Sequence, residues 1–502
     1  MGADRTVWIL TALSALAQII NFSYRVVMAR LVGAEVMGLY QLVMSAYAVI
    51  QALTTVGLTA AMSNLTAQYL AVGDRAGARS LRRTCFGLFC CLMIPVGGIT
   101  VLCSDAISVH LLGDARTRLG LILLIPCLTL TAVENLHKNT FYGAGRPIPP
   151  AVAEVWEQLV RAGAVLGLLY CFLPQYPERA VGLVMWGMIF CEVSSAVTLC
   201  TLYRHCFCDT GGGVPQDSPQ RRRSRICAIA LPVAANALLG NLLGAANSAL
   251  VPRQLVRSGM ERSLAVSKLG VVCGMTMPML ALPTVYLGAL NLILMPKLAR
   301  ATALGRRDEM RRLVSEGMER VCALTVPCMT AMAVFGRELG RILYGREDVG
   351  DYLLPLAVTM GVGCAVSVLA TTLNSIGRQR TVTAITLAGS LVQVGCTALF
   401  TALPGVEMGG FVGGALTSAL LELILCLRAV VRATGLRLTL GKWLLIPALA
   451  SALAGLNARL MLRILQDAGL FPRFAPVMAF AFAAAQYGLV LGLLGNRIDE
   501  NA

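Results

Sequence analysis

Long apolar runs joined by short polar loops make up most of this chain. Each run is about as long as the ~20 residues that an α-helix needs to cross the hydrocarbon core of a bilayer. The runs cover residues 7–29, 37–62, 85–103, 118–137, 150–173, 181–203, 226–250, 266–292, 321–336, 353–374, 383–403, 406–427, 443–462 and 474–494. They predict an all-α polytopic membrane protein with about 14 transmembrane helices, in which sequence neighbours pack antiparallel. A tight turn at Gly33 to Gly38 is expected between the first two runs.

The residues that interrupt these runs recur at a constant spacing of 232 positions. The pairs are Gly38 and Gly270, Gly73 and Gly305, Arg75 and Arg307, Arg79 and Arg311, Pro95 and Pro327, Gly113 and Gly345, Gly145 and Gly377, and Arg146 and Arg378. Because glycine and proline fix backbone geometry, this shared spacing indicates a shared fold. We therefore expect two pseudo-symmetric six-helix lobes, related by a pseudo-two-fold axis along the membrane normal, and two further C-terminal helices.

The duplication divides the chain into four predicted parts. They are an N-terminal lobe at 1–203, a cytoplasmic basic linker at 204–225, a C-terminal lobe at 226–428, and the appended helices at 429–502. The linker contains GGGVPQDSPQRRRSR at 211–225, a Gly-, Pro- and Ser-rich stretch that ends in a basic run. In the C-terminal lobe, Gly240 and Gly244 lie four residues apart, and GGFVGG at 409–414 doubles this pattern. The spacing predicts close approach of helices at both places.

Composition and charge agree with membrane insertion. The chain is 57% hydrophobic and 14% charged, and its formal net charge is +16. Lys and Arg are more numerous on the side of the loop that follows the second run, so the positive-inside rule predicts that this side and both termini are cytoplasmic. We expect a multi-pass protein of the plasma membrane. Its basic residues are dispersed among short loops, which argues against nucleic acid as a partner.

Arginines at the ends of two runs are candidates for substrate binding, because ionisable groups at membrane depth are costly. Arg25 lies about one turn inside the outer end of the first run. It either snorkels to the interface or lines a central cavity. The corresponding end of the seventh run supplies Arg253 and Arg257. Guanidinium groups bind phosphate oxygens in a forked geometry, so convergence of these arginines would suit a pyrophosphate.

A second candidate group lies in the fifth run, where Glu154, Glu157 and Arg161 follow helical spacing. In one interpretation Glu157 pairs with Arg161, and both glutamates are stabilised near a helix N-terminus. In the other, the three residues contact the substrate or carry a proton. Glu192 and Glu422 are further candidates: each either carries a proton or is hydrogen-bonded and neutral. Glu134 is expected to lie at the membrane boundary.

The sequence predicts neither an enzyme nor a cofactor. It contains no P-loop, no GxSxG motif, and no carboxylate pair beside a nucleophile in a polar loop. Most cysteines lie within apolar runs, where thiols behave as small hydrophobic groups. Cys206 and Cys208 follow His205, but a structural zinc site takes four ligands, so no metal site is predicted.

Several segments resemble one known family. They are YRVVMARLVGAE at 24–35, GLYQ at 38–41, GLTAAMSNLTAQY at 57–69, YGAGRPIPPAVAEVWEQLVR at 142–161 and LVPRQLVRSG at 250–259. In order, these resemble the stage V sporulation protein B family of the multidrug/oligosaccharidyl-lipid/polysaccharide exporter superfamily. Related lipid II flippases line their cavity with arginines, and Arg25 and Arg253 match such positions. The chain departs from the familiar pattern at Ala60 and Ala61, where proline and valine are common.

This resemblance implies a flippase that moves a lipid-linked sugar precursor by alternating access, in spore-envelope or cell-wall synthesis. The expected partners are a polyprenyl-pyrophosphate-linked sugar, membrane lipids and a coupling cation. A cation-coupled multidrug antiporter on the same fold is an alternative, but it would need acidic residues in the first helix, which has none after Asp4. A non-transporting scaffold for envelope assembly is a third hypothesis.

Overall fold

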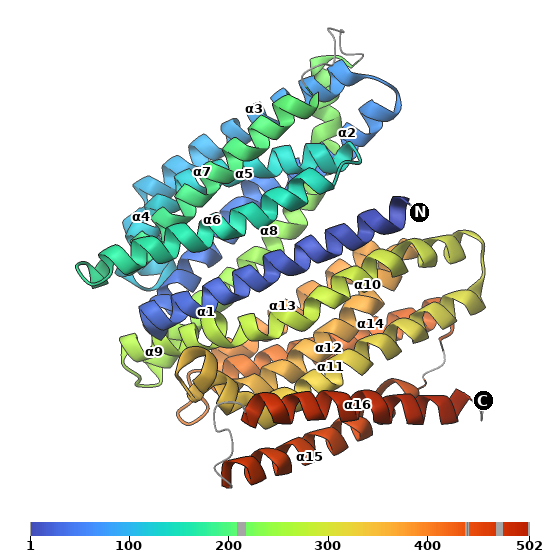
Figure 1. The fold of residues 1–502 in the computed structure, drawn as a ribbon. Helices are drawn as coiled ribbons and strands as arrows, with labels where there is room; N and C mark the ends of the chain where they lie inside the picture. Colours follow the sequence, from blue (N-terminus) through green and yellow to red (C-terminus); the bar gives the residue numbers. More distant parts are fainter. Residues whose placement is uncertain (1, 208–216, 437–438, 440, 468–474, 500–502) are drawn as a thin grey trace. The chain divides into compact units, whose positions relative to one another are not determined.

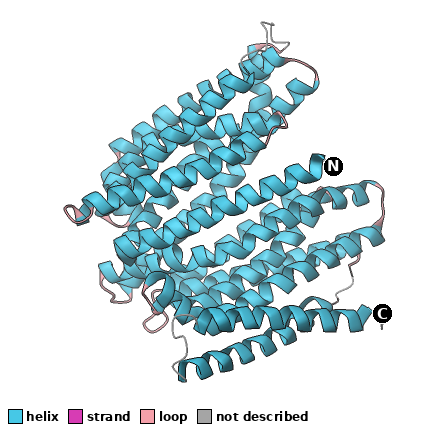
Figure 2. Ribbon diagram, viewed as in Figure 1, coloured by secondary structure: helices cyan, strands magenta, loops and turns pink. Residues whose placement is uncertain are grey.

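The computed structural model describes residues 2–207, 217–436, 439, 441–467 and 475–499, and every regular element in this part of the chain is a helix (Figures 1 and 2). Thirteen segments of these residues are long and apolar enough to cross a membrane. The first, Ile9–Ala71, contains two of the predicted spans, so the described residues hold about fourteen. The predicted all-α polytopic fold is confirmed.

The chain divides into two compact units, 1–274 and 275–502. The longer helices of the first unit are α1 (Gly2–Gln51), α2 (Gly57–Ala71), α3 (Arg75–Leu102), α5 (Arg118–Gly143), α6 (Ile148–Phe172), α7 (Ala180–Phe207), α8 (Pro219–Arg257) and α9 (Arg262–Leu269). Shorter turns are η1 (Ala52–Val56), α4 (Ser104–Ala106), η2 (Ile107–Leu112), η3 (Ala115–Thr117) and η4 (Pro177–Arg179), and η5 (Gly270–Thr276) spans the unit boundary. Within this bundle α6 packs against α1 and α7, and α5 packs against α2 and α7.

The helix α1 consists of two helices joined at Gly33. This glycine has φ 78° and ψ 173°, a conformation that residues with a Cβ rarely adopt. The sequence predicts a turn between Gly33 and Gly38, and the break is found at Gly33 with the helix already resumed at Gly38. A π-helical turn, η1, then connects α1 to α2.

Two glycines of the duplicated pattern meet where α1 crosses the segment α9–η5. A Cβ added to Gly270 would lie 2.7 Å from the backbone N of Gly38, and closer still to the carbonyl oxygen of Ala34. A Cβ added to Gly38 would overlap the carbonyl oxygen of Val266. Positions 34 and 266 also differ by 232, so the contact is unchanged when the two halves are exchanged. This is the pattern expected near a two-fold axis.

The start of α8 is fixed against the end of α2. Tyr69 Oη donates a hydrogen bond of 2.8 Å to Asp217 Oδ2, and Ser218 caps α8. The hydrogen bond from Tyr69, together with the nearby arginines, holds the pKa of Asp217 below its ordinary value. The basic run Arg221–Arg223 thus forms the first turn of a helix, whereas residues 208–216 of the predicted linker lie outside the described residues. The four-part division of the chain stays a prediction.

At Gly240 and Gly244 of α8, the predicted close approach of a second helix is not found among the described residues. A Cβ added at Gly240 or at Gly244 would meet nothing within 4 Å among the described residues. Close approach of helices in the first unit instead involves Gly38 and Gly270. On α14 (Met408–Thr434), by contrast, a Cβ added at Gly410 would overlap the backbone N of Thr401 and one at Gly414 would lie 2.9 Å from Cys396 Cβ, so the close approach predicted at 409–414 is confirmed.

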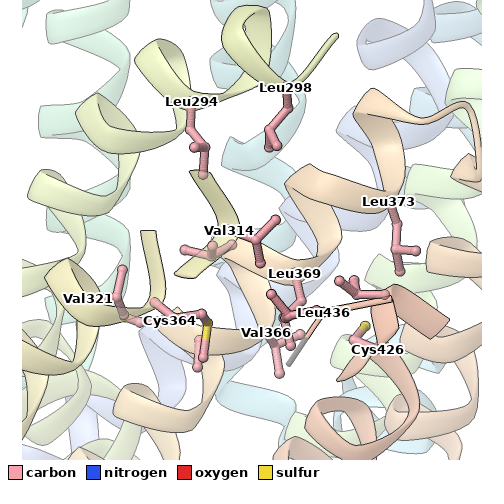
Figure 3. Close-up of a cluster of buried hydrophobic side chains, with 14 of the residues drawn as sticks. Leu294, Leu298, Val314, Val321, Cys364, Val366, Leu369, Leu373, Cys426 and Leu436 are labelled. Atoms are coloured by element: carbon pink, nitrogen blue, oxygen red, sulfur yellow. The ribbon is translucent and has the colours of Figure 1, made fainter. Parts of the chain in front are cut away.

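The second unit is a separate bundle with its own core. Its helices are α10 (Met277–Ala303), α11 (Arg307–Tyr344), α12 (Asp348–Ser375), α13 (Gln379–Phe400), α14 (Met408–Thr434), η6 (Gly441–Leu445), α15 (Ile446–Asp467) and α16 (Ala475–Asp499). In Figure 3, Leu298, Val314 and Leu369 lie in one buried cluster contributed by α10, α11 and α12. The appended helices α15 and α16 pack against each other, and α15 also packs against α11 (Figure 1).

Candidate functional site

Five charged side chains lie together between α5, α6 and α7 of the first unit. Glu157 accepts a hydrogen bond of 2.9 Å from Lys138 Nζ and is paired with Arg161. Lys138 also pairs with Glu134, and Arg161 Nη2 lies 3.3 Å from Glu192 Oε1. The three carboxylate side chains are 3%, 8% and 4% exposed, in chain order. These five residues form the buried charge network.

The depth of each residue in its helix explains part of this arrangement. Glu134 lies nine residues before the end of α5 at Gly143, and Glu157 lies nine residues after the start of α6 at Ile148. Since a short loop joins the two helices and each residue adds 1.5 Å, these glutamates lie at the same depth. Their equal distance from the loop can be read from the sequence and predicts that the two glutamates lie close together. Glu134, for which a position at the membrane boundary was predicted, is buried in the network; its depth in the membrane stays a prediction.

The buried charge network carries an excess of negative charge. Three carboxylates face two cations, which leaves a net charge of −1 when all five groups are ionised. One carboxylate oxygen of Glu134 and one of Glu192 have no hydrogen-bond partner among the described residues. Oxygens of all three glutamates lie within 4.8 Å of one another. A single proton or small monovalent cation bound there would make the network neutral.

Arg25 lies on α1, outside this network. Its side chain is half-buried, and its neighbour Tyr24 is buried. It forms no hydrogen bond or ion pair with any described residue. The guanidinium charge is therefore uncompensated within the part of the chain that the structure describes, in contrast to the charges of Lys138 and Arg161.

Arg253 and Arg257 lie exposed near the end of α8. Arg253 donates a hydrogen bond to the backbone carbonyl oxygen of His110 in η2, and its Nε would lie 3.2 Å from a Cβ at Gly113. Arg257 Nη1 lies 3.4 Å from Gln254 Oε1. Neither arginine contacts Arg25, so the convergence of the three around a ligand stays a prediction.

Two further acidic candidates lie apart from the network. Glu154 is half-buried on α6, one turn before Glu157, and forms no ion pair with a described residue. Glu422 is half-buried on α14 of the second unit and packs over Gly389 of α13. A Cβ at Gly389 would overlap the Glu422 carboxyl group, so the glycine leaves room for it.

A surface network joins the loop before α5 to the turn after Gly33. Arg116 Nη1 lies 2.7 Å from Glu35 Oε1, and its Nη2 lies 3.0 Å from Asp114 Oδ2. Arg262 lies 3.9 Å from the same Asp114 oxygen. Burial raises the pKa of Asp114, but the hydrogen bonds from Arg116 outweigh it, and the pKa lies below its ordinary value. This network fixes the position at which α1 resumes.

Residues 5–302 match the family model described as "Polysaccharide biosynthesis protein". Among curated proteins, stage V sporulation protein B of Bacillus subtilis (strain 168) is 24% identical over 81% of this chain and 79% of its own length. The probable lipid II flippase MurJ of Rhizobium tropici is 24% identical over 46% of this chain and 41% of its own length.

Two solved structures show the same fold at low sequence identity. The lipid II flippase MurJ in an inward closed conformation matches with a TM-score of 0.69 at 10% identity, over 97% of this chain and 99% of the other. An inward-facing multidrug resistance MATE family transporter of the MOP superfamily matches with a TM-score of 0.66 at 14% identity, over 83% and 95% of the two chains. The fold is that of a MATE-like transporter.

Proposed function

Because the chain belongs to the polysaccharide biosynthesis protein family, we propose that it is a flippase for a lipid-linked sugar precursor and not an enzyme. Its likeness to a stage V sporulation protein and to lipid II flippases supports this function. The substrate would be a polyprenyl-pyrophosphate-linked sugar of the peptidoglycan or polysaccharide class, used in cell-wall or spore-envelope synthesis. It would cross from the cytoplasmic to the outer leaflet of the plasma membrane by alternating access.

The observation that carries this proposal is the uncompensated charge of Arg25. The cations buried between α5, α6 and α7 are already paired with carboxylates, whereas Arg25 has no such partner among the described residues. A pyrophosphate loses water when it enters a protein, and a guanidinium offsets that cost through two parallel hydrogen bonds. We propose that Arg25, with Arg253 and Arg257, binds the pyrophosphate while the polyprenyl tail remains in lipid.

We further propose that the buried charge network takes the coupling cation. Its excess negative charge and its two unpartnered oxygens support this role. One bound proton or sodium ion would remove the excess charge. In this scheme Glu157 and Arg161 act in coupling, and Glu154 is the one acid of α6 left for direct contact with the substrate.

Translocation of a defined substrate by Arg25 variants tests the proposed function. Purified protein in proteoliposomes is supplied with a polyprenyl-pyrophosphate-linked sugar, and its appearance in the opposite leaflet is measured. Loss of one arginine in a wet cavity should cost about 2 kcal/mol, which is more than tenfold in affinity. Arg25→Ala should therefore transport weakly. Arg25→Lys should recover part of the activity, since an ammonium group does not form the fork.

The matched control is Arg83→Ala, which removes an exposed arginine from α3. It should transport as the parent does. Equal transport by all variants at matched abundance would refute the role of Arg25. Transport of lipophilic cations in place of the lipid-linked sugar would instead support the multidrug antiporter.

A further inference from the structure

A basic pocket lies in the first unit where α2 ends and α3 begins. Its volume is about 300 Å³. Arg75 and Arg79 line it from the first turns of α3, Arg146 from the loop between α5 and α6, and His205 and Phe207 from the end of α7. Among the described residues no acidic side chain lines it. By the predicted topology, this end of the unit faces the cytoplasm.

The wall of the pocket is held in place by a column of rings and guanidinium groups. Arg82 stacks over the Tyr203 ring, with its central carbon 4.2 Å from the ring centroid. The Tyr203 and Phe207 rings stack with their centroids 4.9 Å apart. The central carbon of the Arg146 guanidinium lies 5.6 Å from the Phe207 ring centroid. Arg82 Nη1 also lies 3.1 Å from His137 Nε2. Arg146 Nη1 also lies 3.5 Å from the carbonyl oxygen of Cys206. None of these contacts is with a carboxylate, so no described residue neutralises the charge of Arg146.

A buried hydroxyl group in the same pocket lacks a partner. Thr66 of α2 lines the pocket and is 1% exposed, yet its Oγ1 makes no hydrogen bond with any described residue. Leaving a buried donor unsatisfied is unfavourable, so such a group usually has a ligand, a water molecule or a protein partner. Thr140 also lines the pocket, but its hydroxyl group already donates a hydrogen bond to the carbonyl oxygen of Leu136 and needs no further partner.

We propose that this pocket binds a phosphate group, with Arg75 and Arg146 on its charged oxygens and the Thr66 hydroxyl as an additional donor. Two guanidinium groups and one hydroxyl, with no acidic side chain among the described residues of the lining, match the demands of a phosphate anion. Two sources carry that group: the head of an anionic phospholipid, and a soluble phosphate. The site is separate from Arg25 and from the buried charge network, so the proposal does not depend on the proposed function.

The experiment measures phosphate binding to the full-length protein in two arms. In the first, the protein is placed in nanodiscs of phosphatidylcholine with or without phosphatidylglycerol, and retained phosphatidylglycerol is counted by native mass spectrometry. In the second, inorganic phosphate is titrated onto protein in neutral detergent, and the shift in Tm is followed. Retention of phosphatidylglycerol alone assigns the site to a lipid head, whereas a phosphate-dependent Tm shift assigns it to a soluble ligand.

The variants are Arg75→Gln/Arg146→Gln, Thr66→Val, and the control Arg223→Gln, which removes an exposed arginine outside the pocket. The double variant should bind at least about tenfold more weakly, because charge-assisted hydrogen bonds are lost. Thr66→Val should weaken binding, yet without ligand it should be no less stable than the parent, because it removes an unsatisfied donor. Arg223→Gln should bind as the parent does. Binding unchanged in all variants, or absent in both arms, would overturn the proposal.

Discussion

Replacing Lys138 by methionine is expected to destabilise the buried charge network strongly. Lys138 contacts both Glu134 and Glu157, and its side chain is only 14% exposed. Without it, three buried carboxylates face Arg161 alone, and the net charge at full ionisation changes from −1 to −2. Removing one partner of a buried pair typically costs about 3–5 kcal/mol. In a unit of this size that lowers Tm by about 10 °C.

Glu157→Gln should cost less, although Glu157 also pairs with two cations. Its loss leaves Lys138 paired with Glu134 and Arg161 paired with Glu192, and the net charge becomes zero. Two charge-assisted hydrogen bonds weaken, and the amide oxygen of glutamine replaces part of them. We expect a loss of about 1–2 kcal/mol. Lys138 and Glu157 each have two ion-pair partners in the network. The expected difference in stability between the two variants therefore comes from the net charge that each one leaves.

The double variant Lys138→Met/Glu134→Gln tests this charge argument directly. It removes one carboxylate with the cation and restores the net charge of −1. Thermal unfolding of the purified proteins in one detergent, followed by tryptophan fluorescence, measures all three variants against the parent. The double variant should recover about half of the Tm lost by Lys138→Met. If the single variant matches the parent, or the double variant is no more stable than the single one, the reasoning is wrong.

Three other predictions address separate features. Gly270→Ala should destabilise the protein by about 1–3 kcal/mol through overlap with the backbone of α1, whereas Gly244→Ala should be neutral or stabilising; equal thermal stability would contradict the crossing. Because the pKa of Asp114 is lowered on folding, its contribution to stability is present above its unfolded pKa of about 3.9 and is lost as pH falls through the folded pKa. Asp114→Asn should therefore remove that part of the pH dependence measured by thermal unfolding between about pH 5 and 2. A cysteine at Arg223, in a background without accessible thiols, should resist membrane-impermeant reagents in intact cells; labelling from outside would reverse the topology.

Sequence reasoning succeeded where the information is local or periodic. The spans follow from apolar runs of sufficient length, and the pairing of Glu157 with Arg161 follows from helical spacing alone. The turn at Gly33 follows from the conformational freedom of glycine. These features need no knowledge of which helix faces which.

Sequence reasoning failed where helix faces decide the outcome. Glu192 reaches Arg161 only because α7 packs against α6, and nothing in the spacing of the chain indicates that face. The same holds for Gly244, where an added Cβ would meet none of the described residues. The basic pocket was missed because its arginines belong to separate loops and helix ends, which look like ordinary positive-inside residues until the bundle brings them together.

The crossing of α1 and α9–η5 has a consequence for the history of the chain. Ala34 and Gly38 meet Val266 and Gly270, and each pair differs by the same 232 positions. A self-complementary surface of this kind is what joins the identical subunits of a two-fold dimer. A half-length ancestor carrying this surface would have assembled with its own copy before fusion joined the two genes. The covalent connection then freed each copy to diverge, while the glycines at the shared crossing kept the original interface.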